Sequence, residues 1–210
     1  MSDLRRGPVA DAIRRHRLIA VLRRVEPQSA LLDLVDEIAD AGVRIFEVTF
    51  DSPSAANDLV ALRARLDARA DGPFVLGAGT LVSVEQLDTA RAAGAQFGVS
   101  PVLALDLLEV AVTIDMPFVP TGMTSTEMYT AWTAGATFVK LFPASAVGPQ
   151  FIRELHGPLP HIEIIPSGGV DGTNARAFLD AGAAAVGLGS ALGRMTGEKR
   201  RELVASIARR

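Results

Sequence analysis

The sequence of 210 residues predicts an α/β fold: a closed (β/α)8 TIM barrel with a short N-terminal helix, forming a single domain over residues 1–210. Three observations predict it. Amphipathic runs that end on Ala-Gly alternate with short apolar runs, eight such apolar runs can be placed, and Gly-rich turns follow the last two. An open doubly wound sheet is the alternative. The short spacing between strands and helices and the lack of an early GxGxxG motif argue against it.

A weak internal repeat marks the ends of four helices. Gly42, Gly94, Gly135 and Gly182 each follow an alanine, close an amphipathic run and precede an apolar run. This pattern is typical of a helix that ends on a left-handed glycine and is followed by a buried strand. Between these units there is room for further strands. The expected strands are residues 18–23, 45–49, 75–78, 97–100, 118–120, 138–142, 162–166 and 184–187.

Several helix beginnings carry capping signals, which agree with this division. They are Ser52-Pro53 as N-cap and first-turn proline, Ser83 with Gln86 and Thr124 with Glu127 as capping boxes, and first-turn prolines at positions 27 and 149.

Composition excludes several classes of protein. With 49% hydrophobic residues the chain can bury a core, which rules out disorder. A net charge of −3 and a pI of about 5.6 disfavour a nucleic-acid partner. Cysteine is absent, which excludes disulfides and thiol chemistry. No signal peptide or run of about 18 apolar residues is present, so we expect a cytoplasmic protein without a membrane partner.

Lys140 is the first candidate for chemistry. Only two of the 21 basic residues are lysines, and Lys140 lies inside an apolar strand where a charge is costly to bury. Lysine, unlike arginine, can lose its proton there and attack a carbonyl carbon to form a Schiff base. The alternative is a structural lysine paired with a carboxylate or reaching the mouth of the barrel.

Glu47 is the second candidate. It shares a strand face with Ile45 and Thr49, so the barrel places it in the same interior as Lys140. A carboxylate beside an amine can move the protons of Schiff-base chemistry. A plain buried ion pair, in which each group compensates the burial of the other, is the alternative.

Two strand ends suit an acidic substrate. Arg23 ends the first strand and can hold a carboxylate through two hydrogen bonds, whereas Arg24 should point the other way. Gly77-Ala78-Gly79-Thr80 ends the third strand, where the glycines allow a ligand close to the backbone and Thr80 can donate a hydrogen bond. Either feature alone is compatible with a surface arginine or a simple tight turn.

Glycine-rich turns follow the seventh and eighth strands. They contain Gly168 and Gly169, and Gly189 followed by Ser190. In barrels these two loops commonly bind phosphate, although tight turns without a ligand also explain them. The three histidines lack metal-ligand spacing, and we expect neither a metal nor a cofactor.

Together these residues predict a barrel that cleaves a carbon–carbon bond of a phosphorylated α-keto acid. A phosphate-barrel isomerase or epimerase with Glu47 as base is an alternative that does not require Lys140. A phosphosugar-binding or assembly protein on an inactive barrel is another, but it gives no reason for a buried amine.

The sequence resembles the 2-keto-3-deoxy-6-phosphogluconate (KDPG) aldolases and their phosphogalactonate and 4-hydroxy-2-oxoglutarate (KHG) relatives. Seven stretches carry the resemblance in family order: AVLR at 20–23, FEVTF at 46–50, GAGT at 77–80, VSP at 99–101, VKLFP at 139–143, GPQF at 148–151 and PSGGV at 166–170. It implies a class I aldolase without a metal that releases pyruvate and D-glyceraldehyde 3-phosphate. It also implies a homo-oligomer, commonly a trimer. A 4-hydroxy-2-oxoglutarate aldolase remains an alternative.

The resemblance also implies a role for each site residue. Lys140 would form the Schiff base and Glu47 would shuttle protons, with Arg23 and Thr80 on the pyruvate carboxylate. Further contacts would be Pro101 and Phe142 as pocket walls and Gly168, Gly169, Gly189 and Ser190 around the phosphate.

Two positions depart from the family pattern. Asp51 stands where some members carry an arginine that contacts the substrate carboxylate, so an inward Asp51 should weaken binding or change the substrate. Thr121 interrupts the Pro-Gly that often follows the fifth strand. Its Cβ either narrows the pocket mouth or is absorbed by a local shift.

Overall fold

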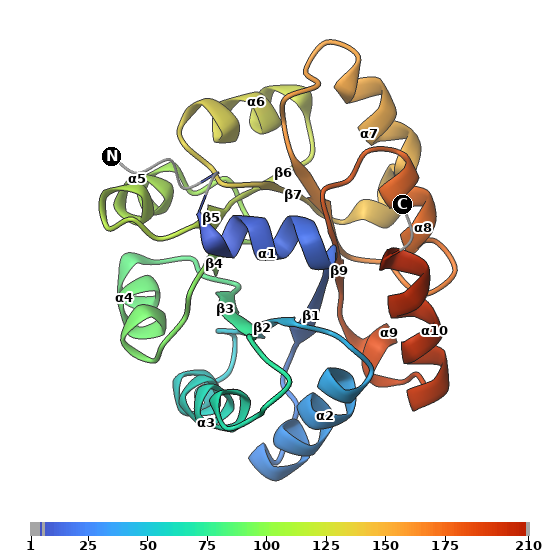
Figure 1. The fold of residues 1–210 in the computed structure, drawn as a ribbon. Helices are drawn as coiled ribbons and strands as arrows, with labels where there is room; N and C mark the ends of the chain where they lie inside the picture. The colour runs from blue at the N-terminus through green and yellow to red at the C-terminus, as the bar shows by residue number, and fades with distance from the viewer. Residues whose placement is uncertain (1–4, 6, 209–210) are drawn as a thin grey trace.

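The computed structural model describes residue 5 and residues 7–208 and has the barrel architecture that the sequence predicts. Figure 1 shows strands around a central axis, helices outside them and one helix across an end of the barrel. The strands are β1 (Leu18–Leu22), β2 (Ile45–Thr49), β3 (Val75–Gly79), β4 (Gly98–Val99), β5 (Phe118–Val119), β6 (Thr121–Gly122), β7 (Val139–Leu141), β8 (Ile164–Pro166) and β9 (Val186–Leu188). The helices are α1 (Pro8–His16), α2 (Gln28–Asp40), α3 (Ala55–Asp67), α4 (Val84–Ala92), α5 (Leu105–Thr113), α6 (Ser125–Thr133), α7 (Gly148–His156), α8 (Ala175–Asp180), α9 (Ser190–Gly193) and α10 (Gly197–Ala208), with a 3-10 turn at Ala144–Ala146.

The strands are parallel and close into eight barrel positions. Their order is β5-β4-β3-β2-β1-β9 in one sheet and β6-β7-β8 in the other. β5 and β6 are two halves of the fifth position, separated by Pro120, which has no N–H to donate. The carbonyl of Pro120 still accepts from the Lys140 N–H at 2.8 Å, and a bridge between Ser167 and Gly187 joins β8 to β9. The predicted (β/α)8 barrel with its short N-terminal helix is therefore confirmed.

The four repeat glycines have the backbone conformation that the sequence predicts. Their φ angles are 101° at Gly42, 98° at Gly94, 105° at Gly135 and 108° at Gly182. A side chain is disfavoured in this left-handed region, so glycine ends each helix and turns the chain into the next strand.

Helix beginnings follow several of the capping signals, and Pro149 lies in the first turn of α7 as predicted. Thr124 and Glu127 form a complete capping box on α6, and Ser83 caps α4 by accepting from the Gln86 N–H at 3.2 Å. The box predicted at Ser83 is incomplete, because the Gln86 side chain accepts from the Val82 N–H. Pro27 is the N-cap of α2 and does not lie in its first turn. Ser52-Pro53 also lies outside its predicted helix: α3 begins at Ala55, because residues 51–54 form a turn before the helix. The prediction of Ser52 as its N-cap was wrong by two positions.

Two hydrophobic clusters hold the barrel together. The inner cluster contains Ile45 and Phe138 together with Ala10 and Ile13 of α1. Figure 1 shows α1 across one end of the barrel. The outer cluster packs the other strand faces against the helices. Side chains alternate along a strand, so Glu47 shares the inner face with Ile45, and Lys140 shares it with Phe138. Both groups therefore face the barrel interior, nearer the C-terminal ends of the strands.

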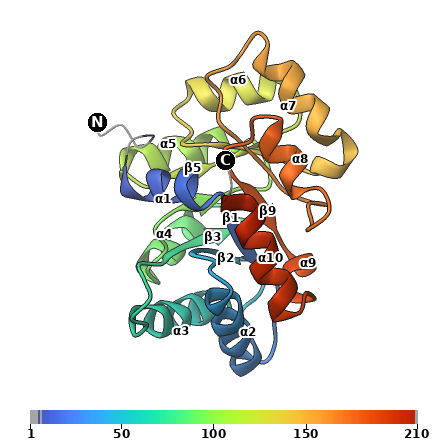
Figure 2. The same ribbon diagram turned by 45° about the vertical axis from the view of Figure 1, so that its right-hand side comes forward.

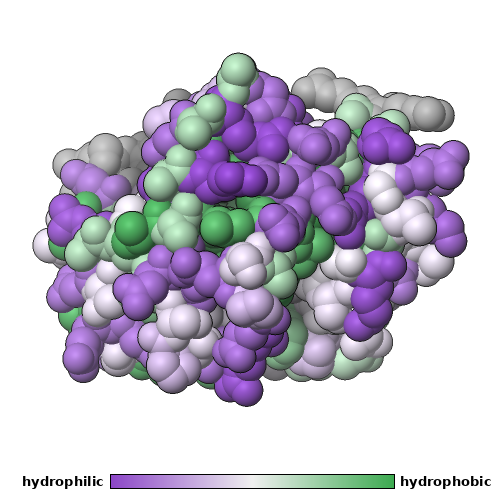
Figure 3. Space-filling view, turned by 90° about the horizontal axis from the view of Figure 1, so that it is seen from below, coloured by the Kyte–Doolittle hydropathy of each residue, from purple (hydrophilic) through white to green (hydrophobic). Residues whose placement is uncertain are grey.

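The helix ring has a polar exterior. Figure 2 shows α10 between α8 and α2, where it completes the ring. Figure 3 shows mostly hydrophilic side chains on the face over α2 and α3, with hydrophobic ones confined to a band. On this face Asp36 of α2 joins Arg65 of α3 at 2.5 Å. Among the described residues, no helix is long and apolar enough to cross a membrane.

Candidate active site

A pocket of about 300 Å³ opens at the C-terminal ends of β1, β7, β8 and β9. Seven of the ten predicted site residues line it. Of the other three, Glu47 lies in the middle of β2, and Thr80 and Pro101 follow the ends of β3 and β4. The lining residues are Val21, Arg23, Lys140, Phe142, Ser167, Gly168, Gly169, Val170, Asp171, Gly189, Ser190, Ala191 and Arg194.

Lys140 presents its amine to this pocket from the middle of β7. The residue is 8% exposed and lies in register between Thr121 of β6 and Ile165 of β8. Its Nζ atom is 5.3 Å from the centre of the Phe142 ring. In the part of the chain that the structure describes, no carboxylate forms an ion pair with Lys140. The alternative of a structural lysine paired with a carboxylate is therefore not what the structure shows.

Glu47 is buried in the barrel on β2, outside the lining of this pocket, with 3% of the residue exposed. Its Oε1 atom has no hydrogen-bond partner among the described residues. Gly79 of β3 makes room for this carboxylate, because a Cβ there would lie only 1.8 Å from Oε1. The sequence suggested that this glycine lets a ligand approach the backbone, whereas in the structure it accommodates Glu47.

Arg23 lies at the end of β1 and contacts two neighbouring strand ends. Its Nη1 lies 2.7 Å from Oδ2 of Asp51, and its Nη2 donates to the Thr80 hydroxyl at 3.3 Å. Arg24 Nε reaches the same Asp51 oxygen at 3.3 Å. The expectation that Arg24 points the other way was wrong, because β1 ends at Leu22 and Arg24 has a φ of 48°, which breaks strand alternation.

Asp51 is a charged partner of these two arginines. Its partial burial acts to raise the pKa of Asp51, but the Thr49 hydroxyl and the guanidiniums of Arg23 and Arg24 outweigh this and hold the pKa below its usual value. The side chain is 18% exposed, against 50% for Arg23. Asp51 is therefore ionised at neutral pH. It forms an ion pair with the guanidinium of Arg23, the group that was predicted to bind the substrate carboxylate.

The side chain of Thr121 is buried in the barrel wall. It is 7% exposed, and its hydroxyl donates to the Ser100 carbonyl at 2.7 Å. It does not line the pocket. Pro101 follows Ser100 and is half-buried beside this bond. Of the two effects considered for the extra Cβ, the structure shows accommodation in the wall.

The turn after β8 packs against the end of β7. Gly168 and Gly169 both have a φ of 79°, and a Cβ on Gly168 would lie 2.7 Å from the Phe142 ring. The Ser145 N–H donates to the Gly168 carbonyl at 3.0 Å. Only glycine satisfies both the backbone angle and the close approach, so this turn brings backbone to the pocket edge opposite Gly189 and Ser190.

Comparisons with known proteins place the chain in a family. The family model "KDPG and KHG aldolase" matches residues 9–207. The chain belongs to the KDPG and KHG aldolase family.

Two curated relatives and one solved structure illustrate the similarity. The 2-dehydro-3-deoxy-6-phosphogalactonate aldolase of Escherichia coli K12 is 39% identical over 176 residues, covering 83% of each chain. The 2-dehydro-3-deoxy-phosphogluconate aldolase of Haemophilus influenzae is 31% identical over 172 residues, covering 81% of this chain and 78% of the relative. The structure described as native KDPGal aligns with a TM-score of 0.77 at 36% identity, covering 90% of this chain and 91% of that one. These relatives are named as aldolases, which are carbon–carbon lyases, so the predicted enzyme class is confirmed at the level of the family.

Two pocket residues of this KDPG/KHG aldolase family member were not among the predicted site residues, although Ser167 belongs to the PSGGV stretch at 166–170. Ser167 directly follows β8 and is 8% exposed. Arg194 ends α9, four residues after Ser190, and lines the pocket from that side. The chain has many arginines, so nothing in the local sequence distinguishes Arg194. Its spacing from Ser190 becomes informative only when residues 190–193 are known to form a short helix.

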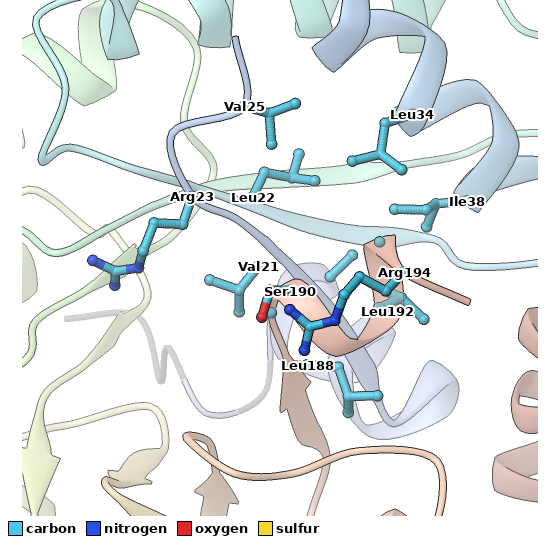
Figure 4. A pocket seen from close by; sticks show the side chains of 13 residues that line it. Val21, Leu22, Arg23, Val25, Leu34, Ile38, Leu188, Ser190, Leu192 and Arg194 are labelled. Carbon is cyan, nitrogen blue, oxygen red and sulfur yellow. The ribbon is translucent and has the colours of Figure 1, made fainter.

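A second, more apolar pocket of about 420 Å³ lies between β1, α2 and α9. Figure 4 shows Leu34 and Ile38 of α2 on one side of it. It shares Arg23, Ser190 and Arg194 with the smaller pocket. The two pockets are therefore neighbours, and only the smaller one includes Lys140.

Proposed function

We propose that this protein is a class I aldolase that reversibly cleaves 2-keto-3-deoxy-6-phosphogluconate, or its galactonate epimer, to pyruvate and D-glyceraldehyde 3-phosphate. The observation that carries the proposal is the amine of Lys140, which is buried in the barrel, has no carboxylate partner among the described residues and lines a pocket edged by glycine turns. The isomerase alternative, with Glu47 as base, does not require such an amine.

The amine of Lys140 performs the first bond change. Its nitrogen adds to the keto carbon C2, and the carbonyl oxygen becomes a hydroxyl. Loss of this hydroxyl as water leaves an iminium group on Nζ. Removal of the proton from the C4 hydroxyl then breaks the C3–C4 bond. The electron pair moves toward the iminium nitrogen to give an enamine, and the aldehyde leaves. Protonation of C3 and hydrolysis release pyruvate and the free lysine.

Glu47 moves the protons in this scheme. Its carboxylate faces the barrel interior, as Lys140 does, and its buried Oε1 has no hydrogen-bond partner among the described residues. A buried carboxylate oxygen without a partner costs free energy, and groups of this kind are concentrated at functional sites. Acting with a water molecule, it would accept and return the protons of the carbinolamine hydroxyl and of the C4 hydroxyl.

The remaining predicted residues bind the two ends of the substrate. Arg23 and Thr80, which share a hydrogen bond, would hold the pyruvate carboxylate, and Phe142 and Pro101 would form the walls. Gly168, Gly169, Gly189 and Ser190 would surround the phosphate, since loops after the last two barrel strands often bind this group. The name of the E. coli relative supports a phosphorylated sugar acid.

Unphosphorylated 4-hydroxy-2-oxoglutarate is a second candidate substrate, because the family model includes KHG aldolases. It would use Lys140, Glu47 and Arg23 in the same way. It would leave the glycine turns after β8 and β9 without a role, and for this reason we favour the phosphorylated substrate.

An assay of pyruvate release tests the proposal. Purified protein is given each of the three keto acids, and pyruvate is measured with lactate dehydrogenase and NADH. We expect turnover of at least one phosphorylated epimer and none by Lys140→Ala. Turnover of the unphosphorylated acid alone would support the second candidate. Absence of pyruvate from all three, with the protein folded, would contradict the aldolase assignment.

We also propose that the enzyme is a homo-oligomer, a trimer by family resemblance. Several large apolar side chains are exposed at the beginnings of α4 and α5 and on α6, namely Val82, Val102, Leu105 and Tyr129. Such exposure is typical of a surface covered by another subunit. Light scattering of the eluting protein would give the mass, and a monomer would contradict the proposal. The cytoplasmic location stays a prediction.

A further inference from the structure

Arg194 is a cation at the edge of the candidate active site to which the proposed chemistry gives no role. We infer that Arg194 binds the terminal phosphate and makes the enzyme select phosphorylated over unphosphorylated aldehydes. The inference rests on the proposed aldolase function and names the residue that decides its substrate class.

The geometry of α9 directs Arg194 toward the predicted phosphate loop. Ser190 is the first residue of α9 and Arg194 follows its last residue, so the two are four positions apart and lie on one side of the helix. Side chains on a helix lean toward its N-terminus, which carries a long arginine back toward Ser190 and Gly189. Figure 4 shows the Arg194 guanidinium extending from the end of α9 toward Ser190.

Arg194 is available for a ligand. The residue is exposed, and among the described residues none forms a hydrogen bond or an ion pair with its side chain. The other charged groups lining the pocket have partners or a chemical role. Arg23 is joined to Asp51, Lys140 is the amine of the reaction, and Asp171 accepts from the Thr173 N–H at 2.8 Å.

The charge pattern fits a substrate with an anion at each end. Arg23 and Arg194 both line the pocket that Lys140 enters, and they come from different strand ends, β1 and the segment after β9. Arginine matches phosphate oxygens with paired N–H groups, so a phosphate among the glycine turns would gain a charge-assisted contact. An aldehyde without phosphate has no anionic group that Arg194 could bind. Replacing Arg194 should therefore affect only the phosphorylated substrate.

The condensation direction provides the test, because it does not depend on knowing the C4 configuration. Pyruvate is combined with D-glyceraldehyde 3-phosphate or with D-glyceraldehyde, and the consumption of pyruvate gives kcat/KM for each aldehyde. For Arg194→Gln we expect kcat/KM to fall about 10- to 100-fold with the phosphorylated aldehyde, a range typical of a lost charge-assisted hydrogen bond. We expect little change with D-glyceraldehyde.

Two further variants sharpen the result. Arg201→Gln removes an exposed arginine seven residues further along, outside the pocket, and should leave both values unchanged. Arg194→Lys keeps the positive charge but lacks the planar guanidinium. Its kcat/KM for the phosphorylated aldehyde should lie between the values of wild type and Arg194→Gln. If the glutamine variant folds poorly, the ratio of kcat/KM for the two aldehydes in Arg194→Lys tests the inference instead.

An unchanged preference for the phosphorylated aldehyde in a folded Arg194→Gln would overturn the inference, as would an equal loss with both aldehydes. Failure of the aldolase proposal is a different result. In that case wild-type protein would form no borohydride-reducible adduct with pyruvate, whereas Arg194→Gln should form the same adduct at the same pyruvate concentration as wild type.

Discussion

Gly79 on β3 leaves the space that the Glu47 carboxylate on β2 fills, because a Cβ at position 79 would lie 1.8 Å from Glu47 Oε1 and 2.5 Å from Cδ. The two residues lie on adjacent strands of the barrel. The absence of a side chain at position 79 therefore makes room for the carboxylate that is proposed to move protons. A glycine here therefore maintains the position of a functional side chain.

Gly79→Ala should displace Glu47 and slow the reaction. We expect kcat for pyruvate release to fall at least about tenfold, and the free energy of unfolding to drop by about 1–3 kcal/mol from overpacking. Enzyme assays and urea unfolding would measure the two effects. Gly72→Ala is the matched control, since its nearest contact would be an ordinary 3.4 Å to Phe74. Wild-type kcat in Gly79→Ala would show that the Glu47 carboxylate is not held as the structure shows.

Asp51→Asn should strengthen the binding of pyruvate. The substitution removes the negative charge 2.7 Å from Arg23 and leaves the guanidiniums of Arg23 and Arg24 for the substrate carboxylate. Because Arg23 is half exposed, we expect only about a threefold to tenfold fall in the KM for pyruvate, weakened by added salt. A rise in this KM would mean instead that Asp51 positions Arg23 for substrate.

Local sequence patterns predicted the barrel and its inner groups well. Gly42, Gly94, Gly135 and Gly182 were identifiable because a left-handed helix end favours glycine whatever surrounds it. Glu47 and Lys140 could be placed inside because strand alternation extends through β2 and β7. These features depend on neighbours in sequence, which a single chain displays.

Other features of the site depend on contacts between distant segments. Arg24 turns toward Asp51 because the strand has already ended, which alternation cannot foresee. The role of Gly79 on β3 depends on Glu47 from the neighbouring strand β2. Arg194 reaches the pocket because it follows the short helix α9. Sequence reasoning identified candidate residues for the site but not these supporting contacts.

Arg200→Met should destabilise the protein and disturb α9. The Arg200 side chain is 3% exposed, lies 2.7 Å from Oε2 of Glu37, and donates to the carbonyls of Leu192 and Gly193 at 3.0 Å each. Removing a buried guanidinium that binds two backbone carbonyls should lower the free energy of unfolding by about 2–4 kcal/mol. Since α9 carries Ser190, the KM for D-glyceraldehyde 3-phosphate should rise more than that for pyruvate. Urea unfolding and condensation kinetics would measure both. Stability equal to wild type would contradict the assigned bonds.

Asp36→Asn should reduce the acid sensitivity of folding. The hydrogen bond from Arg65, supported by Arg69, holds the pKa of Asp36 below its usual value. A carboxyl with a lower pKa in the folded state stabilises the fold above the unfolded pKa of about 4, and loses this effect as the pH falls through the folded pKa. Between pH 6 and pH 3, wild type should lose about 0.5–1 kcal/mol more stability than Asp36→Asn. Equal losses, measured by urea unfolding at each pH, would rule out this contribution.

Trapping of pyruvate with borohydride tests the central claim most directly, namely that the amine of Lys140 forms a Schiff base. Intact mass and peptide mapping should show one pyruvate-derived group on Lys140 in wild type and none in Lys140→Ala. Lys199→Ala, which removes the other lysine of the chain, should keep the full adduct. A folded wild-type protein that forms no adduct at saturating pyruvate, or an adduct that persists in Lys140→Ala, would contradict the account.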